Sequence, residues 1–252
     1  MSAVFRVDPH VKILDERVVR RAKQRGLDAI VYAPHFIRLD EIRARARRFA
    51  DEDLIVVPAR EVFTGDWRSR RHVLMLGLSE PIPDFITLDG AMAELDRQDG
   101  VGLVPHPEFA TVSLGPDEIR RYRDRLSAAE VYNPKHREYQ NERAQRIADE
   151  TGLPGFGSSY AHLRGTVGEV WTAFEGALNS RESVVAAFRD EAPRRVFHRD
   201  GYDHALRRHL EYAHLGYENS WKKIDRLFLS GTEPTHPENV AYGDRFDDVS
   251  VY

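Results

Sequence analysis

The chain has 252 residues, of which 41% are hydrophobic and 31% charged, and its formal net charge is −4. This size and composition fit one large globular domain, and no stretch approaches the roughly 18 consecutive apolar residues of a membrane-spanning helix. The sequence contains no cysteine, which excludes disulfide frameworks, thiolate metal sites and cysteine nucleophiles. Because the N-terminus lacks a basic region followed by an apolar run, we expect a cytoplasmic protein that binds no membrane.

Apolar runs rich in β-branched residues alternate with charged, helix-periodic segments through most of the chain. Seven of these runs are predicted strands: Val4–Asp8, Ala29–Ala33, Leu54–Val57, His72–Leu78, Val101–Pro105, Ala128–Tyr132 and Gly155–Ser159. A further apolar run lies around Val170–Phe174, and helices are expected near residues 15–25, 39–50, 87–99, 116–125 and 138–150. The alternation favours a β/α barrel. An open doubly wound sheet would use similar strands, but the sequence has neither a GxGxxG turn after the first strand nor a P-loop.

The pattern changes toward the C-terminus. We expect a helix from Ser180 to about Asp190 and a long helix from about Tyr202 to Phe228, followed by a tail rich in Pro, Gly, Asn and Asp. The predicted organisation is a barrel over residues 1–178 and a helical extension with its tail, packed on the barrel, over residues 179–252. Four aromatic residues of this extension are interpreted as core packing, with a cap on the barrel mouth or a dimer contact as the alternative: Tyr217, Trp221, Tyr242 and Phe246.

Histidines recur at the ends of the predicted strands. His10 closes FRVDPH, His35 closes AIVYAPH and His106 closes GLVPH. His162 follows the strand in GFGSSYAH, and Glu61 lies in VVPAREVF. The loops after the C-terminal ends of barrel strands converge on one face, so we expect these side chains to meet there.

His72 begins its strand, so it reaches the same face only if this strand runs opposite to its neighbours or forms a hairpin with the preceding one. A single histidine at a strand end is more often a hydrogen-bonded rim residue, but five in register weaken that interpretation, and His136 is a weaker sixth candidate. Imidazole nitrogens with a carboxylate favour zinc, manganese or iron. By contrast, a five-residue spacing does not place His204, His209 and His214 on one helical face, and we expect surface or packing roles for them.

The same segments resemble the motifs of the polymerase and histidinol phosphatase (PHP) superfamily, in the family's order, from about Val4 to Gly168. DPHVK stands where the family has DxHxH, and Pro34-His35 where it has an Asp-His pair. The segments PAREVF, RHVLMLGL, VPHPE, EVYN (with Glu130) and GSSYAH follow, the last in place of GSDAH. The resemblance implies a distorted seven-stranded β/α barrel whose metal ligands here are His10, His35, Glu61, His72, His106 and His162.

The sequence departs from the family pattern at three positions. The second histidine of the opening motif is Lys12, the aspartate before His35 is Pro34, and the aspartate of the last motif is Tyr160. A protonated lysine cannot ligate a metal, and a tyrosine ligates only after its phenol loses a proton. The remaining ligands still suffice for one or two divalent ions, zinc or manganese or iron, because a catalytic zinc needs about three protein ligands and a water.

Four cationic side chains are candidates for neutralising a phosphoryl group during catalysis: Lys12, Arg60, Arg71 and Arg164. Lys12 is also a candidate to replace the charge of one metal ion. For the three arginines, a salt bridge at the barrel rim is the alternative interpretation.

The resemblance predicts a metal-dependent phosphoesterase in which metal-activated water hydrolyses a small phosphate ester or the end of a nucleotide or oligonucleotide. The partner would be a small phosphorylated substrate or nucleotide. The alternative is a PHP barrel without catalysis that serves as a protein- or RNA-binding scaffold, and the three changed positions favour it. Extensive nucleic-acid binding is disfavoured in either case, because it needs a dense basic surface and the net charge is −4.

Overall fold

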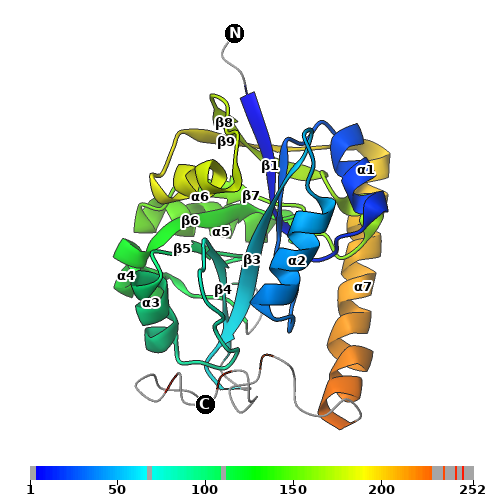
Figure 1. Ribbon diagram of the computed structural model, residues 1–252. Coiled ribbons are helices and arrows are strands. Elements are labelled where there is room, and N and C mark those ends of the chain that lie inside the picture. Colours follow the sequence, from blue (N-terminus) through cyan, green and yellow to red (C-terminus); the bar gives the residue numbers. More distant parts are fainter. Residues whose placement is uncertain are drawn as a thin grey trace.

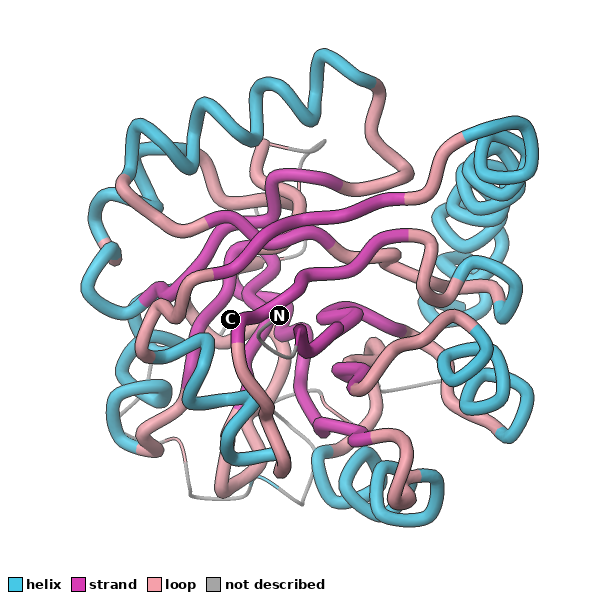
Figure 2. Tube along the Cα trace, turned by 90° about the horizontal axis from the view of Figure 1, so that it is seen from above, coloured by secondary structure: helices cyan, strands magenta, loops and turns pink. Residues whose placement is uncertain are grey.

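The structure, a computed structural model, describes residues 4–66, 70–108 and 112–228 together with Thr235, Tyr242 and Phe246, and in the last helix it describes side chains only as far as His214. Helices surround a central sheet, as the view from above shows (Figures 1 and 2). The strands are β1 (Val4–Val11), β2 (Ala29–Tyr32), β3 (Ile55–Thr64), β4 (Arg71–Leu76), β5 (Val101–Val104), β6 (Leu126–Tyr132), β7 (Gly155–Gly157), β8 (Val170–Glu175) and β9 (Arg194–His198). The α-helices are α1 (Glu16–Gln24), α2 (Leu39–Phe49), α3 (Leu88–Arg97), α4 (Pro116–Arg121), α5 (Glu138–Thr151), α6 (Arg181–Arg189) and α7 (Gly201–Phe228). No described helix is both long and apolar enough to cross a membrane.

The strands form one sheet in the order β7-β6-β5-β4-β3-β2-β1-β8-β9. β1, β2 and β3 are parallel, as are β5, β6 and β7, whereas β4 is antiparallel to both of its neighbours. β7, at one end of the sheet, approaches β8, the second strand from the other end, at Gly157 and Thr172. There the threonine hydroxyl donates to the glycine carbonyl at 2.9 Å and accepts from its amide at 3.0 Å. The sheet is therefore a nearly closed, distorted barrel.

The predicted barrel is confirmed, but its strand count is corrected from seven to nine within the described residues. The run around Val170–Phe174 is β8, which pairs antiparallel with β1. β9 was not predicted, because its sequence RRVFH is charged and its residues are half-buried or exposed, so no apolar run marks it. Both additional strands extend the sheet from the edge of β1 toward β7.

The alternation of side chains along the strands decides what points into the barrel. Val57 and Ala59 of β3 belong to the interior cluster, which Val184 and Phe188 of α6 complete. Residues of the other parity, such as Val56, pack outward against the helices. Glu61 continues the inward face of β3, because side chains two residues apart on a strand point to the same side.

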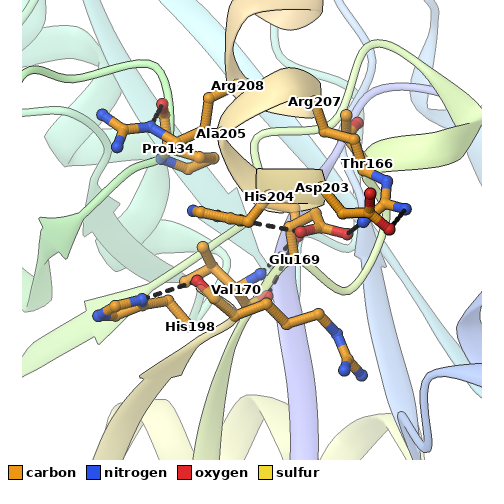
Figure 3. Close-up of polar contacts among 12 residues, drawn as sticks. Pro134, Thr166, Glu169, Val170, His198, Asp203, His204, Ala205, Arg207 and Arg208 are labelled. Atoms are coloured by element: carbon orange, nitrogen blue, oxygen red, sulfur yellow. Dashed lines mark hydrogen bonds and ion pairs between the residues drawn. The ribbon is translucent and has the colours of Figure 1, made fainter. Parts of the chain in front are cut away.

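Helix α7 is fastened to the barrel by a buried carboxylate. Glu169 lies 2.8 Å from Nδ1 of His204 and accepts a hydrogen bond from Arg207 at 3.0 Å (Figure 3). It also accepts a hydrogen bond from Arg25 at 2.7 Å. Burial by itself raises the pKa of Glu169, but the hydrogen bond from His204 and the charges of the two arginines outweigh it and hold the pKa below its ordinary value. His204 is thus a packing residue, as expected from its spacing.

Two of the four aromatic residues predicted to pack in the core lie among the described residues. Tyr242 is 3% exposed and Phe246 is 7% exposed, and both belong to the cluster of Ile82 and Leu39. The side chains of Tyr217 and Trp221 lie outside the described residues. For these two tail residues, the burial agrees with the predicted core packing.

Candidate metal centre

Glu61 is the central residue of the barrel mouth and is fully buried. Its Oε1 lies 3.2 Å from Nδ1 of His72 and 3.1 Å from Nε2 of His106. His72 reaches the mouth because β4 runs antiparallel to β3, with His72 paired to Phe63 near the C-terminal end of β3. His106 follows β5. The ligand atoms of these three residues all lie within 4.8 Å of one another, so they could hold a metal ion.

The other carboxylate oxygen of Glu61 faces a different set of residues. Oε2 accepts a hydrogen bond from Nζ of Lys12 and lies 3.1 Å from Nδ1 of His35 and 3.5 Å from Nε2 of His10. Lys12 also donates to the carbonyl of Ala33 at 2.7 Å. The lysine that replaces the second histidine of the opening motif therefore places an ammonium group among the side chains that would otherwise surround a cation.

The arrangement on the Oε1 side fits a divalent metal. Around an ion with bonds of about 2.0–2.1 Å, neighbouring tetrahedral ligand atoms are about 3.3 Å apart, close to the 3.1 Å and 3.2 Å observed here. His72 has ring nitrogens that are buried and form no hydrogen bond. Such nitrogens are costly to bury, and a metal ion would satisfy Nδ1, which faces Glu61.

Electrostatics keep the surrounding groups in the protonation states that metal ligands require. Burial lowers the pKa of His10 to about 3, and the charge of Lys12 contributes to this shift, so its imidazole is neutral at pH 7. Burial and Lys12 also lower the pKa of His35. Burial alone would raise the pKa of Glu61, but Lys12 and the neighbouring imidazoles hold it well below its ordinary value. Neutral imidazoles and an ionised carboxylate are the forms that bind metals.

Two residues of the mouth adopt a backbone conformation that is rare for residues other than glycine. His106 has φ = 34° and Tyr160 has φ = 42°. Glu130 supports the first of these turns: its carboxylate accepts hydrogen bonds from the amide of His106 at 2.8 Å and from Asn133 at 3.0 Å. Burial raises the pKa of Glu130 to about 7 despite these hydrogen bonds. Strained backbone at a buried polar site is typical of functional positions.

His162 lies at the edge of this cluster. Its ring centroid is 6.2 Å from that of His35, and its Nδ1 contacts Nζ of Lys135. Lys135 lies 3.2 Å from Oε2 of Glu211 and 3.9 Å from the ring centroid of Tyr160. Glu211, from α7, accepts hydrogen bonds from the amide and side-chain groups of the loop after β7.

Five of the six predicted metal ligands thus meet at one point: Glu61 itself and the four histidines that face its carboxylate. The sixth, His162, lies beside them. Of the predicted cations, only Lys12 lies in the centre. Arg60 faces away from Glu61 because adjacent strand residues alternate, and it donates to the carbonyl of Ile37 at 2.6 Å and to Asp84 at 2.9 Å. Arg164 is 56% exposed and pairs with Asp15 at 2.6 Å. The predictions for these two arginines are therefore corrected: Arg164 forms an exposed salt bridge, as the alternative interpretation had it, whereas Arg60 forms a buried ion pair with Asp84.

Lys135 is the residue that sequence reasoning missed. It lies in the loop after β6, near the end of a strand like His10, His35 and His106. Its position near the end of a strand could therefore have identified it. The sequence prediction considered only histidines and carboxylates at strand ends, because these residue types are metal ligands.

Comparisons with known proteins agree with this picture. Residues 138–193 match the family model described as PHP-associated, and no curated protein matches the sequence. Among solved structures the chain is similar to PsfC from Pseudomonas syringae, with 18% identity, a TM-score of 0.62, and coverage of 85% of this chain and 100% of that chain. A two-domain protein from Bacteroides vulgatus that contains a predicted PHP-like metal-dependent phosphoesterase is similar with 17% identity, a TM-score of 0.59, and coverage of 84% and 70%.

The lesion-specific endonuclease PfuEndoQ from Pyrococcus furiosus is also similar, with 14% identity, a TM-score of 0.54, and coverage of 77% of this chain and 58% of that chain. At such identities the structural similarity establishes the fold, and the matching segment over residues 138–193 adds a sequence feature of the family. The resemblance carried by the strand-end motifs is thereby confirmed. The chain has the fold of solved PHP-like proteins, and its residues 138–193 match the PHP-associated family model.

Proposed function

We propose that this protein hydrolyses a phosphoric ester, of a small molecule or of a nucleotide or oligonucleotide end, with one divalent ion bound by Glu61, His72 and His106. The observation that carries the proposal is the pair of contacts from Oε1 of Glu61, 3.2 Å to His72 and 3.1 Å to His106. Three protein ligands leave a position for water or substrate. The nitrogen and oxygen donors favour zinc or manganese, with iron as the next choice.

The charges around Glu61 support one ion rather than two. A positive ammonium stands at Lys12 in place of a neutral imidazole, and neutral residues stand at Pro34 and Tyr160 in place of aspartates. Each change makes the site more positive, and Lys12 already donates to Oε2 of Glu61. A second cation at Oε2 would meet this ammonium at close range, and like charges repel strongly in a buried site.

The chain's own residues would stabilise the charge of the reacting group. When bound, a divalent ion supplies Lewis acidity, which lowers the pKa of water and draws charge from a phosphoryl oxygen. Lys12 keeps Glu61 ionised and oriented. The ammonium groups of Lys12 and Lys135 lie 5.5 Å and 3.9 Å from the ring centroid of Tyr160. Fixed positive charges at the mouth lower the energy of a phosphoryl transition state because they need no reorganisation during the reaction.

A second candidate function is a binding scaffold without catalysis. The specific observation in its favour is again Lys12, because its ammonium compensates the buried Glu61 carboxylate without any metal. In this case the partner would be a protein or an RNA, and the neutral histidines would be structural.

Elemental analysis tests the two functions. We would purify the protein without chelator, alongside His106→Ala and a matched control, His198→Ala, whose imidazole is exposed and lies outside the centre. We would then screen all three proteins for phosphate release from nucleotide and sugar phosphates with added zinc or manganese. Catalysis predicts about one equivalent of metal that is lost only in His106→Ala, together with phosphate release that follows the metal. Wild-type protein that binds no metal and releases no phosphate would contradict catalysis and favour the scaffold.

A further inference from the structure

Four arginine side chains surround the Glu169 carboxylate where α7 is fastened to the barrel: Arg21, Arg25, Arg199 and Arg207. Guanidinium nitrogens of Arg21, Arg25 and Arg207 lie 3.6, 2.7 and 3.0 Å from the same oxygen, Oε1. Figure 3 shows Arg207 beside Glu169. In the described part of the chain, none of the four forms a hydrogen bond or ion pair with Glu61 or the histidines that face it. This arginine cluster is therefore separate from the candidate metal centre.

The carboxylates of the arginine cluster do not balance its guanidinium groups. Apart from Glu169, the only ion-pair partner of these arginines in the described ranges is Asp203, which lies 3.4 Å from Arg207 and is 78% exposed. Arg199 forms no ion pair there, and it donates to two neutral carbonyls at 3.2 and 3.4 Å. Four positive charges therefore face two negative ones. Like charges repel strongly where water is partly excluded.

The acidity of two of these arginines reflects the excess of positive charge. Burial and the charges of the other three arginines lower the pKa of Arg25 to about 10, although the charge of Glu169 acts in the opposite direction. Burial and the charges of Arg207 and Arg199 lower the pKa of Arg21 in the same way. A guanidinium with a pKa of about 10 is still protonated at neutral pH, so the uncompensated charge persists there.

The arginine cluster also has hydrogen-bond donors that the protein does not use. Within the described ranges, Nη1 of Arg21, Arg25 and Arg199 donates to no group. The Nε atoms of Arg21 and Arg25 are buried and form no hydrogen bond either. The side chains of Arg21 and Arg25 are 25% and 12% exposed. This partial exposure strengthens electrostatic attraction relative to open water, yet lets an ion reach the guanidinium groups from solvent.

We propose that the arginine cluster binds a small tetrahedral oxyanion with two negative charges, such as phosphate, at a site distinct from the metal centre. A dianion would bring the negative charges of the cluster to four, equal to the positive ones. Guanidinium groups match the geometry of phosphate oxygens, and hydrogen bonds between oppositely charged groups are the strong ones. The proposal does not depend on the proposed phosphoesterase reaction.

An anion bound here would act on α7 as a whole. This helix carries Arg207 and, about one turn later, Glu211, which accepts hydrogen bonds from the amides of His162 and Leu163 in the loop after β7. By relieving the repulsion among the arginines, the anion would strengthen the attachment of the helix that also holds this loop.

Thermal unfolding of the full-length protein tests the site. Chelator-treated protein is unfolded in phosphate and in sodium chloride at equal ionic strength, because a ligand that binds the folded state raises the Tm. We expect phosphate to raise the Tm of the wild type above its value in chloride, and Arg199→Gln to lose most of this gain. Arg199 is chosen because it is no ion-pair partner of Glu169, so α7 keeps its attachment. The control is Arg146→Gln, since Arg146 is 56% exposed on α5 and lies 4.0 Å from Glu142.

Calorimetric titration with inorganic phosphate measures the affinity of the same proteins. Losing one charge-assisted hydrogen bond weakens binding by about ten-fold. We expect that loss in Arg199→Gln and none in Arg146→Gln. Phosphate that binds at the metal centre or elsewhere on the surface would bind both variants equally, and that result would overturn the proposal. Arg21→Gln should show the same loss and keeps the test decisive if Arg199→Gln does not fold.

Glycerol 3-phosphate distinguishes the two sources of such an anion. If it binds as tightly as inorganic phosphate and also loses affinity in Arg199→Gln, the site accepts the phosphoryl group of a larger molecule. If only inorganic phosphate binds, the ligand is the free ion. Both results support an oxyanion site in the arginine cluster, whereas wild-type protein that binds neither compound would overturn it.

Discussion

Lys12 donates a hydrogen bond to Oε2 of Glu61, while Oε1 of the same carboxylate faces His72 and His106. The two oxygens of this buried carboxylate thus have different partners: one contacts an ammonium group and the other faces two imidazole nitrogens. A carboxylate that bridges two ions needs both oxygens for metal. Since a side chain of the protein occupies one side, the arrangement favours a centre with a single exchangeable cation.

Replacing this lysine with the histidine that the PHP motif has at the same position should raise the metal capacity. In Lys12→His, an imidazole would join His10 and His35 around Oε2 of Glu61, and the repelling ammonium would be gone. We expect the metal content to rise from about one to about two equivalents per chain, because three or four nitrogen and oxygen donors suffice for a further ion. Elemental analysis after dialysis against manganese or zinc measures it.

The control for this experiment is Lys23→His, because Lys23 lies on the surface, where it pairs with Asp51 at 2.7 Å. It introduces a histidine without changing the centre and should leave the metal content as in the wild type. If Lys12→His still binds the same amount of metal as the wild type, Lys12 is not what limits the site to one ion.

The ion pair between Lys12 and Glu61 should contribute strongly to the free energy of unfolding of the metal-free protein. Lys12→Met keeps the length of the side chain but leaves the Glu61 carboxylate buried without its cation. Breaking a buried ion pair from one side costs about 3–5 kcal/mol, so we expect a loss of that size in the free energy of unfolding, measured by urea denaturation with chelator present. Added zinc should restore part of the loss, because a ligand that binds the folded state stabilises it. A loss no larger than that of Lys23→Met on the surface would contradict the prediction.

Much of the candidate site could be predicted from the sequence, because the ends of the strands in a barrel lie close together in space. His10, His35 and His106 are far apart in the chain, yet each lies at or just after the end of a strand that faces the mouth. The direction of the strand that His72 begins could only be stated as a condition, since the sequence of a strand does not reveal whether its partner is parallel. The antiparallel pairing of β3 and β4 meets that condition.

Other features of the fold and of the site could not be predicted from the sequence patterns. Arg60 was selected for its charge beside Glu61, although the two-residue period of a strand places neighbours on opposite faces. The ninth strand lacks the apolar alternation by which strands are recognised, because it lies at the exposed end of the sheet. The burial of Glu211 from α7 depends on a tertiary contact with the loop after β7, and no local pattern marks such a contact.

The closing contact of the barrel predicts a sharp difference between two glycines. A Cβ atom on Gly157 would lie 2.4 Å from Cγ1 of Val196 in β9 and 3.0 Å from Cγ1 of Val170 in β8. Gly157→Ala should therefore destabilise the protein by about 1–3 kcal/mol, the usual cost of overpacking a tight core. Gly165→Ala is the control, because nothing lies within 4 Å of the position that its methyl group would take. Thermal unfolding compares them, and equal melting temperatures would show that β7 and β9 do not pack closely.

The attachment of α7 should depend on pH through Glu169. The pKa of this carboxyl is below its ordinary value of 4.5 in the folded protein, so its ionised form stabilises the fold. This contribution is complete above the pKa of the unfolded chain and is lost as the pH falls through the lower folded pKa. Glu169→Gln should therefore cost about 3–5 kcal/mol near neutral pH, where Arg25 and Arg207 lose their buried partner.

Urea denaturation from neutral pH to about pH 3 should show the difference between wild type and Glu169→Gln shrinking at the acid end, because protonation removes the same charge from the wild type. Glu175→Gln, at the exposed end of β8, makes the same chemical change outside the cluster and serves as the control. A difference that stays constant over the whole range would mean that the packing of Glu169, rather than its charge, holds α7. In that case the charge of Arg207 would contribute little, and Arg207→Gln should be nearly as stable as the wild type at every pH.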